Sequence, residues 1–130
     1  MTRNTRTYTD LDAAFTLNPR TRDVAVKIDE AAVRNSIRNL IHTKNYERPF
    51  QPSLGCQVHG LLFENLTPLT INVAERTIWQ VLNKYEPRIE ILSIDVAAGA
   101  DDISMNVEVI YRILNTNQPL RFNTTFTRVR

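Results

Sequence analysis

The sequence predicts an α+β fold, with an antiparallel β-meander sheet covered by two long helices and one short helix. Apolar residues recur at helical spacing in two stretches before residue 86, and after residue 88 they alternate in three successive stretches. Turn-forming residues separate the alternating stretches. The 130 residues, 42% of them hydrophobic, are enough for one domain with a buried core.

The beginning of the chain differs from the rest. Residues 1–22 are polar with little periodicity, which predicts an extended arm, and residues 23–130 are expected to form the single domain. Leu11, Phe15 and Leu17 are the candidate anchors of this arm. Residues 24–28 alternate and predict a short strand.

The first helix is expected to begin after Asp29, a good N-cap residue. Its apolar stripe consists of Val33, Ile37, Leu40 and Ile41. Its outward face carries Arg34, Asn35 and Arg38. Residues 43–55 then form a loop stiffened by two prolines, with Arg48 and Phe50 as candidate interface residues. A second interpretation, compatible with the first, is that Phe50 closes the edge of the core.

A short helix is predicted over residues 58–64, with Leu61, Leu62 and Phe63 in the core. Thr67 and Pro68 open the second long helix, because proline at the first helical position loses no hydrogen bond. The apolar face of that helix consists of Ala74, Ile78, Val81, Leu82 and Tyr85.

The second helix must stop at Pro87, which also pushes Glu86 toward an extended conformation. Residues two apart in an extended segment point the same way, so Glu86 and Arg88 project together from this corner. They can bind each other or a partner chain through charge-assisted hydrogen bonds. The alternative is a helix end with two solvated charges.

Three strands follow, joined by turns at residues 99–102 and 115–119. In the first, Ile94 and Val96 share a face with Glu90 and Leu92. The core face of the second strand is expected to consist of Met105, Val107, Val109, Tyr111 and Ile113. That of the third strand is expected to consist of Leu120, Phe122, Thr124 and Phe126. The last strand is a candidate sheet edge, unless residues 24–28 pair with it.

The net charge is only +2, but residues 109–130 contain arginines and no acidic residue. Arg121, Arg128 and Arg130 are candidate interface residues that favour an acidic protein partner. The alternative is that they form a solvated face of the strand. They are spread along a strand without supporting lysines, so nucleic acid is not an expected partner. No apolar run is long enough for a membrane span, and the single Cys56 indicates synthesis in a reducing compartment.

Three stretches carry a family resemblance: residues 48–56 (RPFQPSLGC), 62–70 (LFENLTPLT) and 85–89 (YEPRI). In order and spacing they resemble the small baseplate wedge subunit of contractile-tail phages of the T-even type, a domain that recurs in type VI secretion baseplates. The resemblance implies a structural protein of the virion tail baseplate, assembled in the host cytoplasm.

The resemblance also implies the partners. In similar proteins the domain lies near the tail tube within a six-fold assembly, and its Glu-Pro-Arg corner holds the helical core bundle of neighbouring wedge proteins. Its sheet offers a starting point for the tail sheath. Carried onto this chain, that corner is Glu86, Pro87 and Arg88.

Two other functions are alternatives to a structural role. A peptidoglycan hydrolase needs two carboxyl groups across a cleft, for which Glu64 and Glu86 are the candidates, but Arg88 would lower the pKa of Glu86, the wrong direction for a general acid. A bacterial anti-adaptor regulator shares the domain, and the neighbouring genes would identify that case. Cys56 and His59 are too few for a zinc site, and no cofactor-binding motif is present.

Overall fold

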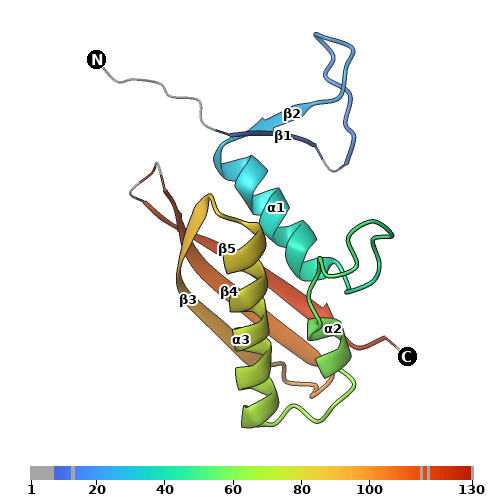
Figure 1. Cartoon of the computed structure of the whole chain (residues 1–130), viewed down its shortest axis with the longest axis vertical. Helices are drawn as coiled ribbons and strands as arrows, with labels where there is room; N and C mark the ends of the chain where they lie inside the picture. The colour runs from blue at the N-terminus through green and yellow to red at the C-terminus, as the bar shows by residue number, and fades with distance from the viewer. Residues whose placement is uncertain (1–7, 13, 115, 117, 130) are drawn as a thin grey trace.

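The computed structural model describes residues 8–12, 14–114, 116 and 118–129 (Figure 1). Its elements, in chain order, are β1 (Thr9–Leu11), β2 (Val26–Ile28), α1 (Glu30–His42), α2 (Val58–Leu61), α3 (Pro68–Tyr85), β3 (Ile89–Ala98), β4 (Ser104–Ile113) and β5 (Pro119–Thr127). The predicted α+β class and the antiparallel meander are confirmed.

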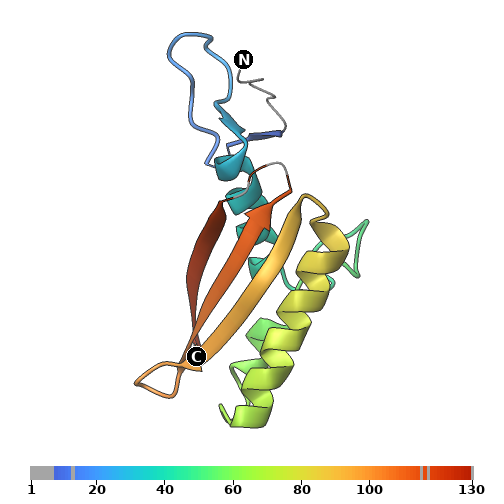
Figure 2. The same ribbon diagram turned by 90° about the vertical axis from the view of Figure 1, so that its left-hand side faces the viewer.

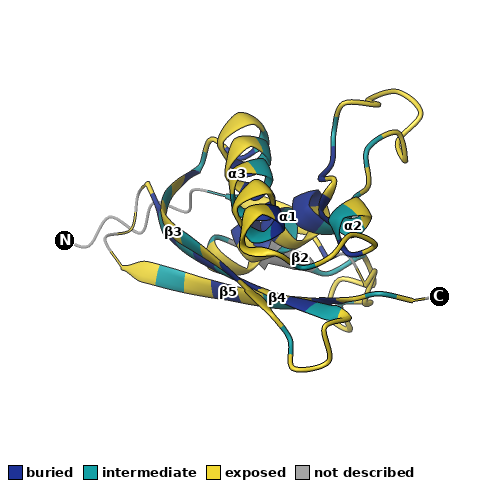
Figure 3. Cartoon of the chain, turned by 90° about the horizontal axis from the view of Figure 1, so that it is seen from below, coloured by how far each residue is buried: buried dark blue, intermediate teal, exposed yellow. Residues whose placement is uncertain are grey.

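The main sheet has the order β3-β4-β5, and both of its pairings are antiparallel. Helices α1, α2 and α3 lie on one face of it (Figure 3). No helix of the described residues covers the other face, and the three strands run side by side across it (Figure 2). Strands β1 and β2 form a separate two-stranded ribbon at the start of α1.

The core lies between the helices and the sheet. The predicted stripe of α1 is fully buried, as are Ala74, Ile78 and Leu82 of α3 and the predicted face of β4. Thr67 caps α3 as expected, because its hydroxyl accepts a hydrogen bond from the Thr70 N–H. Phe122 and Phe126 bring β5 into the same core.

Strand β3 departs from simple alternation. Its pairing with β4 shifts between Ile91 and Ser93, so Leu92 forms a bulge and is half exposed. Before the bulge the odd-numbered residues face the helices, and after it the even-numbered Ile94 and Val96 do so. Neither row of residues therefore makes the core face alone.

The N-terminal prediction needs correction. Leu11, Phe15 and Leu17 are all more than half exposed and do not anchor the segment. Tyr8 packs against the core instead, and its N–H donates to the Asp29 carboxylate. Asp29 is the N-cap of α1 by position, with a φ of 50° and no side-chain capping bond to the helix.

Two other interpretations that placed aromatic residues in or at the core are wrong. Phe50 is 97% exposed, so it does not close the edge of the core, and Phe63 is 66% exposed while Leu62 is buried. The loop that carries Phe50 closes tightly, because the Cys56 N–H donates to the Thr43 carbonyl at 2.8 Å. Gly55 permits this closure with a φ of 131°.

None of the helices among the described residues is both long and apolar enough to cross a bilayer.

Candidate functional site

The corner after α3 is built around one ion pair. The Arg88 Nε donates to Glu86 Oε1 at 2.6 Å, and its Nη2 donates to Oε2 at 2.7 Å. Because Pro87 stiffens the backbone between them, the guanidinium and carboxylate planes meet in a bidentate pair. The Glu86 side chain is 2% exposed and that of Arg88 is 23% exposed. The expected pair thus binds internally, and its acid is buried rather than solvated.

The buried carboxylate is ionised. Burial would by itself raise the pKa of Glu86, but hydrogen bonds from Arg88 and Ser36 and the charge of Arg88 hold that pKa below its ordinary value. The hydrogen bond to Glu86 likewise raises the pKa of Arg88. Since Ser36 belongs to α1, the pair connects α1 to the end of α3.

The corner also contains residues that sequence reasoning did not predict as part of the site. The Arg88 guanidinium lies 5.3 Å from the centre of the Tyr8 ring, a cation–π arrangement. The negative charge of Asp10 acts on the same guanidinium. Tyr8 and Asp10 lie in a segment without periodicity, so only a tertiary structure could reveal this contact.

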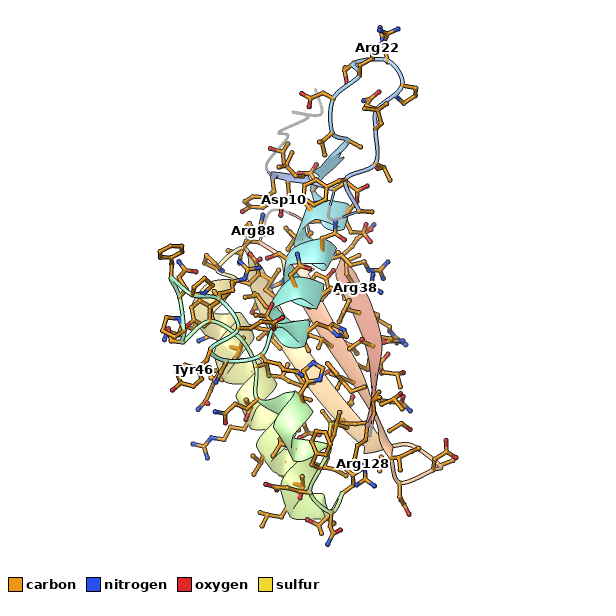
Figure 4. The ribbon with its side chains drawn as sticks, turned by 90° about the vertical axis from the view of Figure 1, so that its right-hand side faces the viewer. Asp10, Arg22, Arg38, Tyr46, Arg88 and Arg128 are labelled. Carbon is orange, nitrogen blue, oxygen red and sulfur yellow. The ribbon has the colours of Figure 1, made fainter. Side chains whose placement is uncertain are left out.

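The loop of residues 43–55 lies on the side of the molecule where Arg88 lies (Figure 4). Tyr85, the last residue of α3, donates from its hydroxyl to the Ser53 carbonyl at 2.9 Å. The Tyr46 N–H donates to the Pro52 carbonyl, so the loop is also braced internally. Arg48 and Phe50 are exposed on it. The bond from Tyr85 thus connects the loop to the end of α3, and the predicted interface residues of the two, of which Glu86 is buried, are called here the corner surface: Arg48, Phe50, Glu86, Pro87 and Arg88.

The other predicted interface residues lie apart from this surface, on and after β5. Arg121 is on the strand, 73% exposed, with its Nη1 3.8 Å from Glu108. Arg128 follows the strand and donates its N–H to the Ile103 carbonyl. Arg130 lies outside the described residues.

Strand β5 is an edge of the main sheet within the described part of the chain. The alternative that residues 24–28 cover it is wrong, because β2 pairs with β1. Since the Arg128 N–H points toward Ile103, antiparallel alternation turns the N–H and C=O groups of the odd-numbered residues away from β4. This outward row consists of Arg121, Asn123, Thr125 and Thr127.

The opposite edge, β3, is protected. A carboxylate oxygen of Glu75 on α3 accepts a hydrogen bond from the Val96 N–H at 3.3 Å. The bulge at Leu92 further disturbs the edge. A bulge and a polar side chain on an edge both hinder the addition of another strand.

The two candidate catalytic carboxylates do not form a pair. Glu64 comes four residues before α3, and Glu86 directly follows it. A helix of 18 residues is about 27 Å long, whereas glycosidase carboxyl groups lie roughly 5–9.5 Å apart. Glu86 is in addition held by Arg88 in its ionised form.

No three His, Cys, Asp or Glu side chains cluster around Cys56 and His59 or elsewhere in the described ranges. Cys56 is buried, and burial raises the pKa of its thiol, which disfavours the nucleophilic thiolate. His59 packs edge-on against Phe126 at 5.0 Å. Cys56 thus belongs to the hydrophobic core, and His59 packs against Phe126 of β5.

Comparison with known proteins gives consistent relatives. Residues 18–118 match the model of a family described as baseplate wedge protein gp25. Baseplate wedge protein gp25 of Enterobacteria phage T4 is 34% identical over 108 residues, 83% of this chain and 81% of the relative.

Solved structures share the fold. A putative tail lysozyme from Geobacter sulfurreducens has a TM-score of 0.71 and 27% identity, covering 78% of this chain and 92% of that one. A chain of the baseplate complex from the type VI secretion system has a TM-score of 0.65 and 16% identity, covering 77% of this chain and 93% of that one. The latter likeness concerns the fold alone.

Replacing Arg88 with alanine should destabilise the isolated protein by on the order of 3 kcal/mol, because it leaves a buried carboxylate without its partner. This corrects the expectation of two solvated charges, whose loss would cost little. Urea unfolding would measure the change. The matched control is Arg112→Ala, which breaks the exposed Arg112–Glu90 pair and should cost less than about 1 kcal/mol. Equal costs for the two variants would contradict the buried pair.

The same pair should make stability depend on acid. Because folding lowers the pKa of Glu86, its contribution is complete above the ordinary glutamate value, about 4.3, and is lost as the pH falls through the lower folded value. Glu86→Gln should flatten this part of the stability curve. A variant curve parallel to the wild-type curve below pH 4.3 would contradict the assignment.

Proposed function

The chain belongs to the baseplate wedge protein gp25 family, and on this premise we propose that it joins neighbouring wedge proteins through its corner surface and starts the tail sheath at β5. Family membership makes it a structural component of the tail baseplate in the virion. The proposed partners are the helical core bundle of other wedge proteins and the sheath protein, within a six-fold assembly. The observation that carries the proposal is the bidentate Glu86–Arg88 pair.

That pair prepares Arg88 for a partner. A guanidinium has five N–H donors, and Glu86 accepts from two of its nitrogens while fixing its plane. The remaining donors can reach the carbonyl groups at a helix end or a carboxylate of the core bundle. A guanidinium that is already oriented loses little conformational entropy on binding.

The loop supplies the apolar part of the corner surface. Phe50 is almost fully exposed on a loop braced by internal hydrogen bonds and by Tyr85. An exposed aromatic side chain beside an arginine is a common composition for the centre of a protein interface. Arg48 adds a second positive charge to the same loop.

The joining role can be tested without disturbing the fold. Phe50→Ser should leave the melting temperature unchanged, because the side chain is exposed, and should reduce co-purification with the other wedge subunits about tenfold or more. Leu69→Ser, at the far end of α3 and 73% exposed, is the matched control and should co-purify normally. Normal incorporation of the Phe50 variant would argue against the corner surface.

The sheath role rests on the open edge of β5. Its outward row offers backbone donors and acceptors to an extended segment, while the β3 edge is obstructed by Glu75 and the Leu92 bulge. Strand addition takes register and affinity from backbone hydrogen bonds, and side chains select the partner. The arginines at this end of the chain would select an acidic neighbour.

Thr125→Pro should give baseplates whose tubes carry little or no sheath. The Thr125 N–H belongs to the outward row, so proline there removes a donor to a partner and none to β4. Electron microscopy of assembled tails would reveal the sheath. Thr124→Pro is the matched control for folding. The Thr124 N–H faces β4, so the loss of this hydrogen-bond donor should destabilise the domain itself. Normal sheathed tails from the Thr125 variant would refute this role.

Peptidoglycan hydrolysis is the second candidate, favoured by the description of the Geobacter structure as a putative tail lysozyme. The separated positions of Glu64 and Glu86 speak against it. The purified protein should therefore not clear a suspension of cell walls at any pH between 4 and 8. Clearing that disappears in the Glu64→Gln variant would establish the hydrolase instead.

A further inference from the structure

A groove runs between α1 and the open edge of β5. Arg34 on α1 donates to the Arg121 carbonyl at 2.8 Å, and two turns later His42 bonds to the Thr124 hydroxyl at 2.9 Å. The distance from Arg34 to His42 is about 12 Å along the helix, and that from Arg121 to Thr124 is about 10 Å along the strand. Because these distances are similar, α1 and β5 run nearly parallel. Figure 4 shows Arg38, which lies between them on α1, on this side of the molecule.

The space between the two elements is not filled by the protein. Two hollows of about 540 and 610 Å³ follow one another along the groove and share Arg38 and Asn123 in their linings. The other lining residues are Arg34, Asn35, Asn39, His42, Arg121, Phe122, Thr124 and Thr125. None of these described residues is acidic, so the groove is basic and polar.

The Arg34 side chain occupies one position that an added strand would need. The Arg121 carbonyl belongs to the outward row of β5, and in the free protein its hydrogen bond comes from Arg34. Arg34 is itself exposed, so this bond is worth little and can be exchanged for one from a strand N–H. Arg34 thus supplies a hydrogen bond to the Arg121 carbonyl in the free protein, and an added strand can replace it.

The arginine spacing matches that of a strand. Arg34 and Arg38 are one helical turn apart, which separates their Cβ atoms by about 5–6 Å. In an added strand every second side chain faces α1, and such residues lie about 6.7 Å apart. Carboxylates at positions i and i+2 would therefore meet the two guanidinium groups.

We propose that this groove receives an extended acidic segment of a partner polypeptide, which pairs with β5, displaces Arg34 from the Arg121 carbonyl and sets carboxylates two residues apart against Arg34 and Arg38. The inference rests on the proposed strand addition at β5 and adds the chemistry of the partner. A polypeptide fits because the edge offers alternating backbone donors and acceptors, which a nucleic acid backbone cannot match.

The test uses the ¹⁵N-labelled protein and two synthetic peptides about as long as β5, one alternating threonine with glutamate and the other threonine with glutamine. The glutamate peptide should shift the amide signals of Asn123 and Thr125 and should bind about tenfold more tightly at low salt. Added salt should reduce this advantage, because the groove is open to solvent.

Variants separate the two arginine roles. Arg38→Gln should weaken binding of the glutamate peptide about fivefold and leave the affinity for the glutamine peptide unchanged. Arg34→Met should tighten the glutamine peptide, because the carbonyl of Arg121 becomes free. Arg76→Gln, an exposed arginine on α3, is the matched control and should change neither affinity.

Each contrary result overturns a defined part. Equal affinities of the two peptides, both abolished by Thr125→Pro, would overturn the acidic preference and leave strand addition standing. Shifts caused by a single-stranded oligonucleotide but by neither peptide would overturn the inference altogether. So would the absence of any shift with millimolar peptide, whereas the sheath role itself is decided by the tails built with Thr125→Pro.

Discussion

The buried ion pair between Glu86 and Arg88 connects parts of the fold that are distant in sequence. Glu86 ends α3, Arg88 begins the approach to β3, Ser36 reaches the carboxylate from α1, and Tyr8 covers the guanidinium from the N-terminal segment. Its geometry depends on Pro87, which stops the helix and turns both side chains to one side. A buried carboxylate that loses its charged partner is strongly destabilising, so the folded protein keeps Glu86 and Arg88 in contact.

On the proposed joining role, the same pair would allow a buried, stabilising contact to serve an interface as well. A guanidinium in water samples many rotamers, and ordering it on binding costs free energy. Glu86 removes that cost in the folded monomer, because the carboxylate has already fixed the guanidinium plane. The exposed loop next to it is braced in a similar manner through Tyr85 and Ser53. If the corner surface joins neighbouring wedge proteins as proposed, stability of the monomer and readiness for assembly would depend on the same residues.

Local patterns in the sequence predict the helices, the order of the strands in the meander and the placement of Glu86 and Arg88 on one side of the corner, but they leave open whether these two residues bind each other. The stripe of α1, the Thr67 cap and the alternating face of β4 follow from spacing and from residue type. The bulge at Leu92 escaped prediction because both rows of β3 contain apolar residues, so spacing alone cannot show where the core face changes. Tyr8 and the basic groove escaped because their contacts join residues far apart in the chain, such as Arg34 and Arg121.

The two edges of the sheet show how assembly can be given a direction. At β3 the carboxylate of Glu75 holds the Val96 N–H, and the bulge removes the regular ladder that a second strand would need. At β5 the ladder is regular, and the contact at the Arg121 carbonyl comes from an exposed, replaceable arginine. On the proposed strand addition, the basic side chains that line the groove beside β5 would favour an acidic strand there, whereas the bulge and the bond to Glu75 would hinder any added strand at β3. One sheet can thus accept a partner on a single side, which is what an ordered multi-subunit assembly requires.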